Sequence, residues 1–205
     1  TICVSNYPYL NCLMKNFRIE LLSRCLKNRR SPYNKYPILP YQENIENITS
    51  PSNVICHKRG TEFEEFIVQL FDRTLFTLLE WRSDKTVNGI SPFMNRFPDL
   101  EFYFNLNSES LQFAIECKWR EYFYKDCIEL NDYQLGNYSA FENTTNIPVF
   151  IALGVGNKPS CPSEIYIIPL REIQDRKLHS IMLKPYQRPR PYDSFFLDCS
   201  NKILK

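Results

Sequence analysis

The sequence predicts an α/β fold, a three-layer sandwich in which helices flank a central mixed β-sheet. Two observations predict it. Helical segments and strand-sized apolar runs follow one another in the order helix, three strands, helix, two strands. Hydrophobic residues make up 43% of the chain and charged residues 23%, which is enough apolar material to bury a core.

The first helix is indicated by an apolar stripe. Phe63, Phe66, Ile67, Leu70 and Phe71 are spaced three, one, three and one residues apart, and this spacing places them on one face of an amphipathic helix. We therefore expect this helix to pack against the sheet.

The remaining elements are indicated by branched and aromatic runs separated by turn-forming residues. Because residues 105–110 form turns readily, the strand before them and the strand after them are expected to pair as an antiparallel hairpin. We predict strands over 74–81, 99–104, 111–118, 147–153 and 164–168, a loop over 83–97, a helix over 132–141 and a helical turn over 170–175.

The charge distribution divides the chain into three parts. Residues 1–57 carry 7 basic and 3 acidic side chains, residues 58–175 carry 11 and 18, and residues 176–205 carry 7 and 2. We interpret 1–57 as a basic N-terminal accessory region with a helix over 17–26 and a linker over 31–52. The core is 58–175, and 176–205 is a basic, Pro-containing C-terminal extension that favours an extended arm. Basic ends around an acidic centre fit phosphate-binding arms beside a carboxylate site, and they fit ordinary solvated charge equally well.

Several protein classes are excluded or disfavoured. No apolar run approaches the roughly 20 residues of a membrane span, and no cleavable signal pattern is present. The eight cysteines include no C-x-x-C pair, so we expect reduced thiols and a cytoplasmic location; a zinc site at Cys56 and His57 is the weaker alternative. The chain begins at Thr1 rather than Met, which is typical of a fragment or processed chain and leaves room for an upstream domain.

The residues that carry chemistry lie around the expected hairpin. Asp99 begins one strand, and Glu116, Cys117 and Lys118 end the next. Side chains alternate along a strand, so Glu116 and Lys118 share a face, and Asp99 can converge with Glu116 across the hairpin. Two carboxylates with the backbone carbonyl of Cys117 form a hard oxygen site for Mg²⁺, with Mn²⁺ as a substitute. The ammonium of Lys118 suits a site that stabilises a phosphate and transfers protons.

These residues resemble a known family. Pro98-Asp99 followed by Glu116-Cys117-Lys118 is similar to the PD-(D/E)xK motif of restriction-endonuclease-like nucleases. The resemblance covers roughly 58–175. It implies a restriction-endonuclease-like core, a divalent metal and a catalytic role for Asp99, Glu116 and Lys118.

Two further motifs strengthen the resemblance. Gly60 to Glu64 is similar to the G-x-x-x-E signature of Holliday-junction resolvases, and Gln134 to Tyr138 is similar to the Q-x-x-x-Y motif of RecB-type nucleases. The resemblance implies that Glu64 and Gln134 support the site, with Tyr138 as further support. Glu101 lies two residues after Asp99 on the same strand face and is an additional or substitute ligand.

Each motif also fits a purely structural role. Thr61-x-x-Glu64 is also a capping box, and Pro98-Asp99 also fits a plain turn. Glu116 and Lys118 also fit a surface ion pair on a strand. Gln134 and Tyr138, four residues apart, also fit the edge of an amphipathic helix.

The function predicted by this set is metal-dependent phosphodiester hydrolysis. The leading hypothesis is a DNA endonuclease in restriction, recombination or mobile-element biology. The alternatives are an inactive nuclease-like module that binds DNA or a protein, an exonuclease, and a nuclease acting on RNA. We expect nucleic acid as the partner, no membrane, and either a homodimer or a missing upstream domain.

Overall fold

The computed structural model describes residues 51–82 and 96–205. The helix expected over 17–26, most of the linker over 31–52 and most of the loop over 83–97 lie outside the described residues. Within the described part of the chain, no helix is long and apolar enough to cross a membrane. The cysteines in this part are all free thiols: Cys56, Cys117, Cys127, Cys161 and Cys199.

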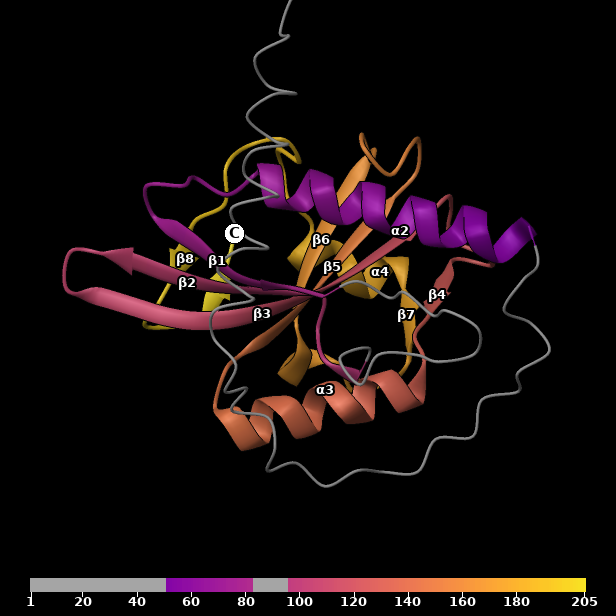
Figure 1. Ribbon diagram of the computed structural model, residues 1–205. Coiled ribbons are helices and arrows are strands. Elements are labelled where there is room, and N and C mark those ends of the chain that lie inside the picture. The colour runs from indigo at the N-terminus through magenta and orange to yellow at the C-terminus, as the bar shows by residue number, and fades with distance from the viewer. Residues whose placement is uncertain (1–50, 83–95) are drawn as a thin grey trace, which may run out of the picture. The chain divides into compact units, whose positions relative to one another are not determined.

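A five-stranded mixed sheet forms the centre of the fold, in the order β1-β2-β3-β5-β6 (Figure 1). Every neighbouring pair is antiparallel except β3 and β5, which are parallel. This confirms the predicted α/β architecture with a mixed sheet. The strands are β1 (Phe76–Trp81), β2 (Leu100–Leu106), β3 (Glu109–Arg120), β5 (Val149–Val155) and β6 (Glu164–Pro169).

The β2–β3 hairpin has the turn that its sequence favours. Leu106 pairs with Glu109, which leaves Asn107 and Ser108 as a two-residue loop. Asn107 has a φ of 55°, in the left-handed region that Asn tolerates better than most residues. The turn fixes the register of the two strands, and therefore which side chains face each other near their far ends.

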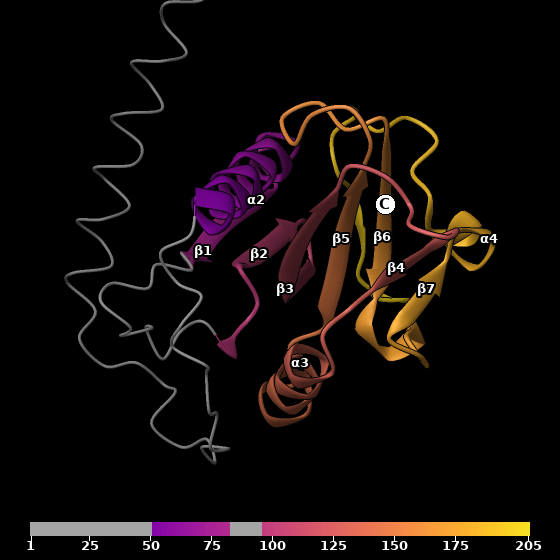
Figure 2. The ribbon, with the colours of Figure 1, turned by 90° about the vertical axis from the view of Figure 1, so that its right-hand side faces the viewer.

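Helix α2 (Pro51–Gln69) covers one face of the sheet and α3 (Asp132–Thr145) the other (Figure 2). Phe63 and Ile67 of α2 are fully buried in the main core. A Cβ added at Gly154 in β5 would lie 2.4 Å from Cε2 of Phe63. The absence of a side chain at Gly154 therefore lets α2 approach the sheet closely.

Helix α3 is defined at both ends by asparagine. The Asn131 side chain accepts hydrogen bonds from the backbone N–H groups of Tyr133 and Gln134, and so caps the N-terminus. Asn146 ends the helix in the left-handed conformation with a φ of 59°, and its N–H bonds to Glu142 O over 2.9 Å. The predicted helix over 132–141 is confirmed, and it extends to Thr145.

The C-terminal segment packs on the core instead of extending as an arm. Phe195, Leu197 and Leu204 are buried in the main cluster, and the last two lie on the paired strands β8 (Leu197–Asp198) and β9 (Ile203–Leu204). The buried Arg188 donates hydrogen bonds to the carbonyls of Asp193 and Ser194. These apolar residues outweigh the spaced prolines that favoured an arm.

Several small elements were not predicted. A second, two-stranded sheet joins β4 (Cys127–Glu129) to β7 (Lys177–His179). The short helical turns α4 (Ser180–Leu183) and η4 (Lys184–Tyr186) were also not predicted, whereas η3 (Leu170–Glu172) confirms the helical turn predicted over 170–175. Helix α2 starts at Pro51, so the expected boundary at 57/58 falls inside a continuous helix.

Candidate active site

Asp99 and Glu116 lie opposite each other at the end of the β2–β3 hairpin. The last pair in the register is Leu100 with Ile115, so the next positions are Asp99 and Glu116. The backbone N–H of Cys117 donates to Asp99 Oδ2 over 2.7 Å, which holds the Asp99 carboxylate against β3. Both acids are buried, with 7% of Asp99 and 2% of Glu116 exposed. Two acids this deeply buried require a compensating partner.

Lys118 supplies part of that compensation. Its Nζ forms an ion pair with Glu116 Oε1, and its side chain is only 18% exposed. Glu116 and Lys118 share one face of β3, whereas Cys117 faces the main core with the α2 residues. Glu116 Oε2 is buried and has no hydrogen-bond partner among the described residues. An acceptor oxygen in this state is available to a cation.

The electrostatics show that a third carboxylate lies near. Burial raises the pKa of Asp99 well above its ordinary value, and the charges of Glu116 and Glu64 raise it further. Lys118 and the Cys117 N–H act in the opposite direction. Burial also raises the pKa of the Cys117 thiol, and the negative charges of Asp99, Glu64 and Glu116 add to this shift. Negative charge is therefore concentrated here beyond what Lys118 balances.

Glu64 lies in the middle of α2 and bonds to the end of β1. Its Oε2 accepts a hydrogen bond from Trp81 Nε1 over 2.7 Å. The capping-box alternative is wrong, because α2 begins at Pro51 and Thr61 is inside the helix, where its hydroxyl donates to His57 O. The Glu64 carboxylate therefore accepts a hydrogen bond from the Trp81 indole and does not cap the helix.

Arg82 is a site residue that the sequence analysis missed. Its backbone N–H donates to Asp99 O over 2.7 Å, and its Nη1 donates to Pro98 O over 2.8 Å. Its Nη2 forms a buried ion pair with Glu101 Oε1 at 2.6 Å. Three contacts from one residue fix the segment that carries Asp99. The signal for it was Glu101 itself, because an acid on the inward face of a strand needs a basic partner.

Both carboxylate oxygens of Glu101 accept hydrogen bonds. Oε1 accepts from Arg82 and Oε2 accepts from Gln112 Nε2 over 3.2 Å. With both oxygens engaged, Glu101 is better suited to position Asp99 than to bind a metal, and we leave it out of the proposed ligand set.

Gln134 and Tyr138 lie on α3, which covers the other face of the sheet from α2 (Figure 2). Tyr138 is buried, with 2% exposed, and Gln134 is half-buried in the first turn. The Gln134 amide makes no hydrogen bond to a described residue, so its place in the site stays a prediction.

The donor set fits a hard divalent cation. Asp99, Glu116 and the Cys117 carbonyl are oxygen donors, the type that Mg²⁺ prefers, and Mg²⁺ retains several waters rather than requiring a protein cage. No group of three or more His, Cys, Asp or Glu side chains in the described ranges is spaced to hold a metal ion. The fit instead rests on the Oε2 of Glu116, which has no hydrogen-bond partner in the part of the chain that the structure describes, and on the negative charge of Glu116 and Glu64 around Asp99.

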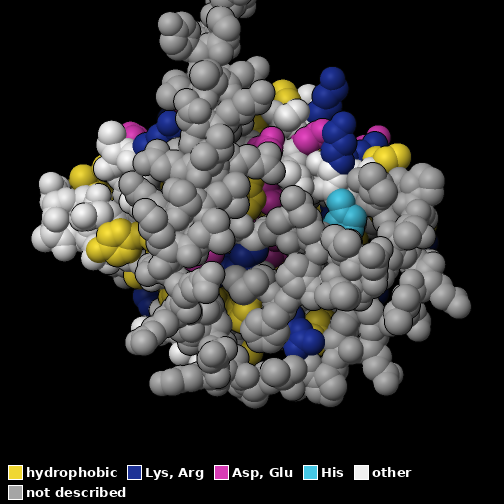
Figure 3. All heavy atoms as spheres, viewed as in Figure 1, with side chains coloured by type: hydrophobic (Ala, Val, Ile, Leu, Met, Phe, Trp, Pro, Cys, Tyr) yellow, Lys and Arg dark blue, Asp and Glu magenta, His cyan; other side chains and the backbone are white. Residues whose placement is uncertain are grey.

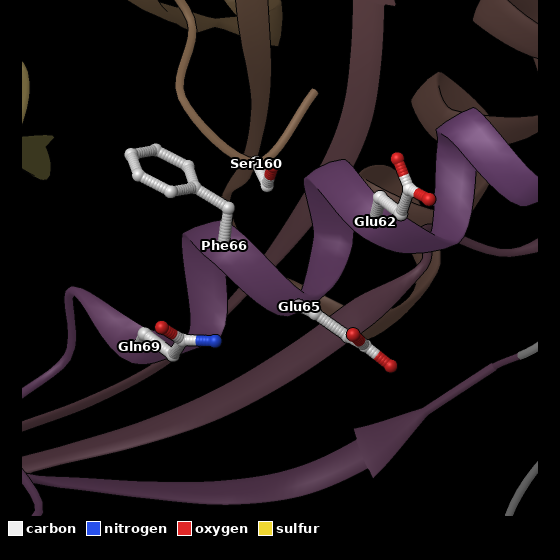
Figure 4. A pocket seen from close by; sticks show the side chains of 5 residues that line it. All are labelled: Glu62, Glu65, Phe66, Gln69 and Ser160. Atoms are coloured by element: carbon white, nitrogen blue, oxygen red, sulfur yellow. The ribbon is translucent and has the colours of Figure 1, made fainter. Parts of the chain in front are cut away.

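On the face seen in Figure 3, acidic and basic side chains lie side by side near the centre, where β2 and β3 are drawn in Figure 1. A separate small pocket of about 90 Å³ lies between α2 and the loop after β5. Figure 4 shows Phe66 and Ser160 on one side of α2, with Glu65 pointing away from Ser160. Glu64 does not line this pocket, which is therefore distinct from the carboxylate site.

No protein-family model matches the chain, and no curated protein matches it. Among solved structures, it is similar to Hjc, a Holliday junction resolvase from the archaeal hyperthermophile Archaeoglobus fulgidus. The sequences are 15% identical, the match covers 62% of this chain and 88% of that chain, and the TM-score is 0.44. The site assignment therefore rests on the geometry above alone.

Proposed function

We propose that the chain is a divalent-metal-dependent nuclease that hydrolyses phosphodiester bonds, and that it is a DNA endonuclease. One observation carries the proposal: the buried carboxylates of Asp99 and Glu116 face each other across the hairpin, with the Lys118 ammonium beside them. A surface ion pair alone does not explain a buried Glu116 with one oxygen that accepts no hydrogen bond from any described residue.

The roles of the residues follow from their chemistry. Asp99, Glu116 and the Cys117 carbonyl would hold Mg²⁺, which supplies an activated water and neutralises charge on the phosphate. Hydrolysis forms a bond from the water oxygen to phosphorus, breaks the bond from phosphorus to the leaving oxygen, and delivers a proton to that oxygen. Lys118 would orient the water or stabilise the charge that develops on the phosphate, and its ion pair with Glu116 supports this role.

Glu64 and Arg82 act around this set. The Glu64 carboxylate, fixed by Trp81, adds negative charge near Asp99 and suits hydrogen bonding to a metal-bound water. Arg82 positions Asp99 through the backbone of Pro98 and Asp99. Gln134 is proposed as a support residue on the strength of the motif resemblance alone.

Two experiments test the proposal. Cleavage assays on supercoiled, linear, branched and single-stranded DNA, and on RNA, should show Mg²⁺- or Mn²⁺-dependent products with wild type and none with Asp99→Ala. Asp193→Asn, which removes a carboxylate paired with Arg190 in the C-terminal segment, is the matched control and should cleave normally. Internal nicks identify an endonuclease, whereas products released only from ends identify an exonuclease.

Calorimetry tests the metal separately. Mg²⁺ should bind wild type and lose affinity in Asp99→Ala, and Ca²⁺ should bind without supporting turnover. Unchanged Mg²⁺ affinity in Asp99→Ala would show that the metal ligands are other residues. Binding of DNA by a wild type that never cleaves would favour the inactive module.

A further inference from the structure

The segment that joins β3 to β4 places two tyrosines in solvent. Tyr122 and Tyr124 are 65% and 66% exposed. Phe123 between them is half-buried instead, and its ring meets the Tyr166 ring edge-on, with 6.1 Å between the centroids. Tyr166 is buried on β6. Phe123 therefore anchors the segment to the fold, and its two neighbours present their rings to solvent.

The anchor lies on the same side of the sheet as Lys118. In the register of the sheet, Lys118 pairs with Leu153 of β5, and Leu153 pairs with Tyr166 of β6. Paired residues on neighbouring strands share a face, so Tyr166 faces the side that carries Lys118 and Glu116. Tyr122 is four residues beyond Lys118, so their Cα atoms are at most about 14 Å apart. The segment therefore lies within reach of a nucleic-acid strand bound at the carboxylate site.

A cation accompanies the second ring. Lys125 Nζ lies 5.4 Å from the centroid of the Tyr124 ring. Lys125 and Asp126 are the central residues of a turn, which is closed by a hydrogen bond from Cys127 N–H to Tyr124 O over 3.1 Å. Both central residues have positive φ, 49° and 61°. Asn and Gly adopt this backbone most readily, so the lysine is held in a conformation that it seldom occupies.

Contacts from α4 fix the turn. The Ser180 N–H donates to Asp126 O over 3.1 Å, and the Ser180 hydroxyl donates to the Asp126 carboxylate. Figure 2 shows the segment after β3 reaching the end of the fold where α4 lies. Ile181 and Met182 follow Ser180 and are exposed, which extends the apolar surface beside the turn. The tyrosines therefore belong to a supported surface.

This combination of groups suits a nucleic-acid strand whose bases are unpaired. An aromatic ring stacks on the face of a nucleobase, and a base offers that face only when it is splayed out of a helix. A cation beside the ring can contact a phosphate of the same strand. Two outward-facing tyrosines and one lysine are the groups that such a stacking site requires.

We propose that Tyr122, Tyr124 and Lys125, here called the tyrosine platform, bind unpaired bases of a nucleic-acid strand on the Lys118 side of the sheet. The inference rests on the proposed nuclease function and specifies its substrate class. That class is nucleic acid with unpaired nucleotides beside the cleaved bond, as in a flap, a branch or a single strand. Tyr122 and Tyr124 stack on bases, and Lys125 contacts a phosphate.

Fluorescence anisotropy in Ca²⁺, which prevents cleavage, tests the tyrosine platform. The probes are a labelled oligothymidine single strand and a blunt DNA duplex of the same length. Tyr122→Ala and Tyr124→Ala should each weaken single-strand affinity about 5- to 150-fold, the loss of one base stack. Tyr122→Phe and Tyr124→Phe keep the ring and should keep the affinity. Duplex affinity should change less than about twofold in all four variants, because stacked bases hide their faces.

Lys125→Asn tests the cation. Asparagine tolerates the left-handed backbone and carries no charge, so the turn should form as before. The slope of log affinity against log salt on the single strand should fall in magnitude by about 0.7, the contribution of one phosphate contact. An unchanged slope would overturn the phosphate contact assigned to Lys125.

Tyr103→Ala is the matched control. Tyr103 is an exposed tyrosine of β2 that pairs with Gln112, toward the hairpin end of β3 and away from Arg120, where β3 ends. Its loss should leave single-strand affinity unchanged, and the platform variants should melt at the wild-type temperature. An equal loss in Tyr103→Ala, or normal single-strand affinity in both platform alanine variants, overturns the tyrosine platform. A change of oligomeric state in those variants, measured by light scattering, also overturns it, because the surface would then join copies of the chain.

The outcomes separate the two proposals. If wild type cleaves DNA and the alanine variants bind the single strand normally, the tyrosine platform is wrong and the nuclease proposal stands. If wild type never cleaves, yet the alanine variants lose single-strand affinity, the nuclease proposal is wrong and the tyrosine platform stands.

Discussion

The Arg82 guanidinium and the Glu101 carboxylate form a buried ion pair, with Nη2 2.6 Å from Oε1 and side chains only 4% and 2% exposed. The same guanidinium donates to Pro98 O. Glu101 lies two residues into the strand that Asp99 precedes, so the pair ties the end of β1 to the segment that presents Asp99. We infer that this pair positions Asp99 rather than reacting itself.

Removing one partner of the pair should destabilise the fold. Arg82→Ala leaves Glu101 buried without its cation, which costs about 3–5 kcal/mol. Arg82→Met/Glu101→Met replaces the pair with apolar volume and should fold, because such replacements are often neutral. The double variant should nevertheless lose about 10- to 100-fold in Mg²⁺ affinity, because Asp99 loses its anchor.

A second buried arginine provides the control for this prediction. Arg188→Lys disturbs contacts to the carbonyls of Asp193 and Ser194 in the C-terminal segment. Denaturant unfolding and calorimetry should show reduced stability but unchanged Mg²⁺ affinity. Equal affinity losses in the Arg188 and Arg82 variants would mean that both act only through general stability.

Glu64→Gln isolates the charge of Glu64. Glutamine keeps a side-chain oxygen that can accept the Trp81 Nε1 hydrogen bond, so the free energy of unfolding should change by less than about 1 kcal/mol. The negative charge near the metal is lost, and cleavage should fall by about 10- to 100-fold. Trp81→Phe is the converse change, because it keeps the charge and removes the donor. A Glu64→Gln enzyme with normal turnover would remove Glu64 from the site.

The raised pKa of Asp99 predicts a pH dependence of stability. Burial, Glu116 and Glu64 favour the protonated acid in the folded state, so folding takes up a proton at a pH between the unfolded and folded pKa values. The stabilisation is complete below the unfolded value and is lost as pH rises through the folded value. Metal-free protein should therefore melt at lower temperature as pH rises above the ordinary carboxyl range.

Asp99→Asn tests this dependence. The amide oxygen can still accept from the Cys117 N–H, but it cannot ionise, so the fall in melting temperature should be smaller. Mg²⁺ should raise the melting temperature of wild type more at higher pH, because it binds the ionised acid. An identical pH profile in wild type and Asp99→Asn would contradict the assignment.

Alanine substitutions at Gly154 and at Gly60 should change the free energy of unfolding in opposite directions. At Gly154 the new Cβ would meet the fully buried Phe63 ring, and such overpacking costs about 1–3 kcal/mol. At Gly60 it would meet nothing within 4 Å, and Ala should stabilise the helix by about 1 kcal/mol. Denaturant unfolding of both variants measures whether the free energy of unfolding falls at Gly154→Ala and rises at Gly60→Ala.

The central hairpin and its facing acids could be predicted from the sequence because both depend on local rules. Alternation along a strand puts Glu116 and Lys118 on one face, and a two-residue turn at Asn107 fixes the register that brings Asp99 opposite Glu116. These rules need no knowledge of distant residues, so the sequence alone was enough to predict the hairpin.

The parts that could not be predicted depend on partners far apart in the sequence. The first turns of α2, such as His57 and Lys58, are exposed and lack the apolar stripe that revealed the helix from Phe63 onward. The pairing of Arg82 with Glu101 depends on the register of β1 against β2, across a segment with no pattern of its own. The three-residue strands of the second sheet are too short to show a period.

Lys118 gives the sharpest test of the catalytic proposal. Its ammonium forms an ion pair with Glu116 Oε1, while the other oxygen of Glu116 has no hydrogen-bond partner among the described residues. Lys118→Ala should therefore abolish cleavage and leave Mg²⁺ affinity unchanged or slightly higher, because a nearby positive charge opposes a cation. Lys118→Arg keeps the charge but not the compact ammonium that can donate a proton, so it should also cleave poorly.

DNA affinity should fall only modestly in both Lys118 variants, because one phosphate contact changes the salt slope by about 0.9. Single-turnover cleavage and calorimetry on the same preparations separate these effects. Cleavage by Lys118→Ala at near wild-type rate would show that this lysine is only the structural partner of Glu116.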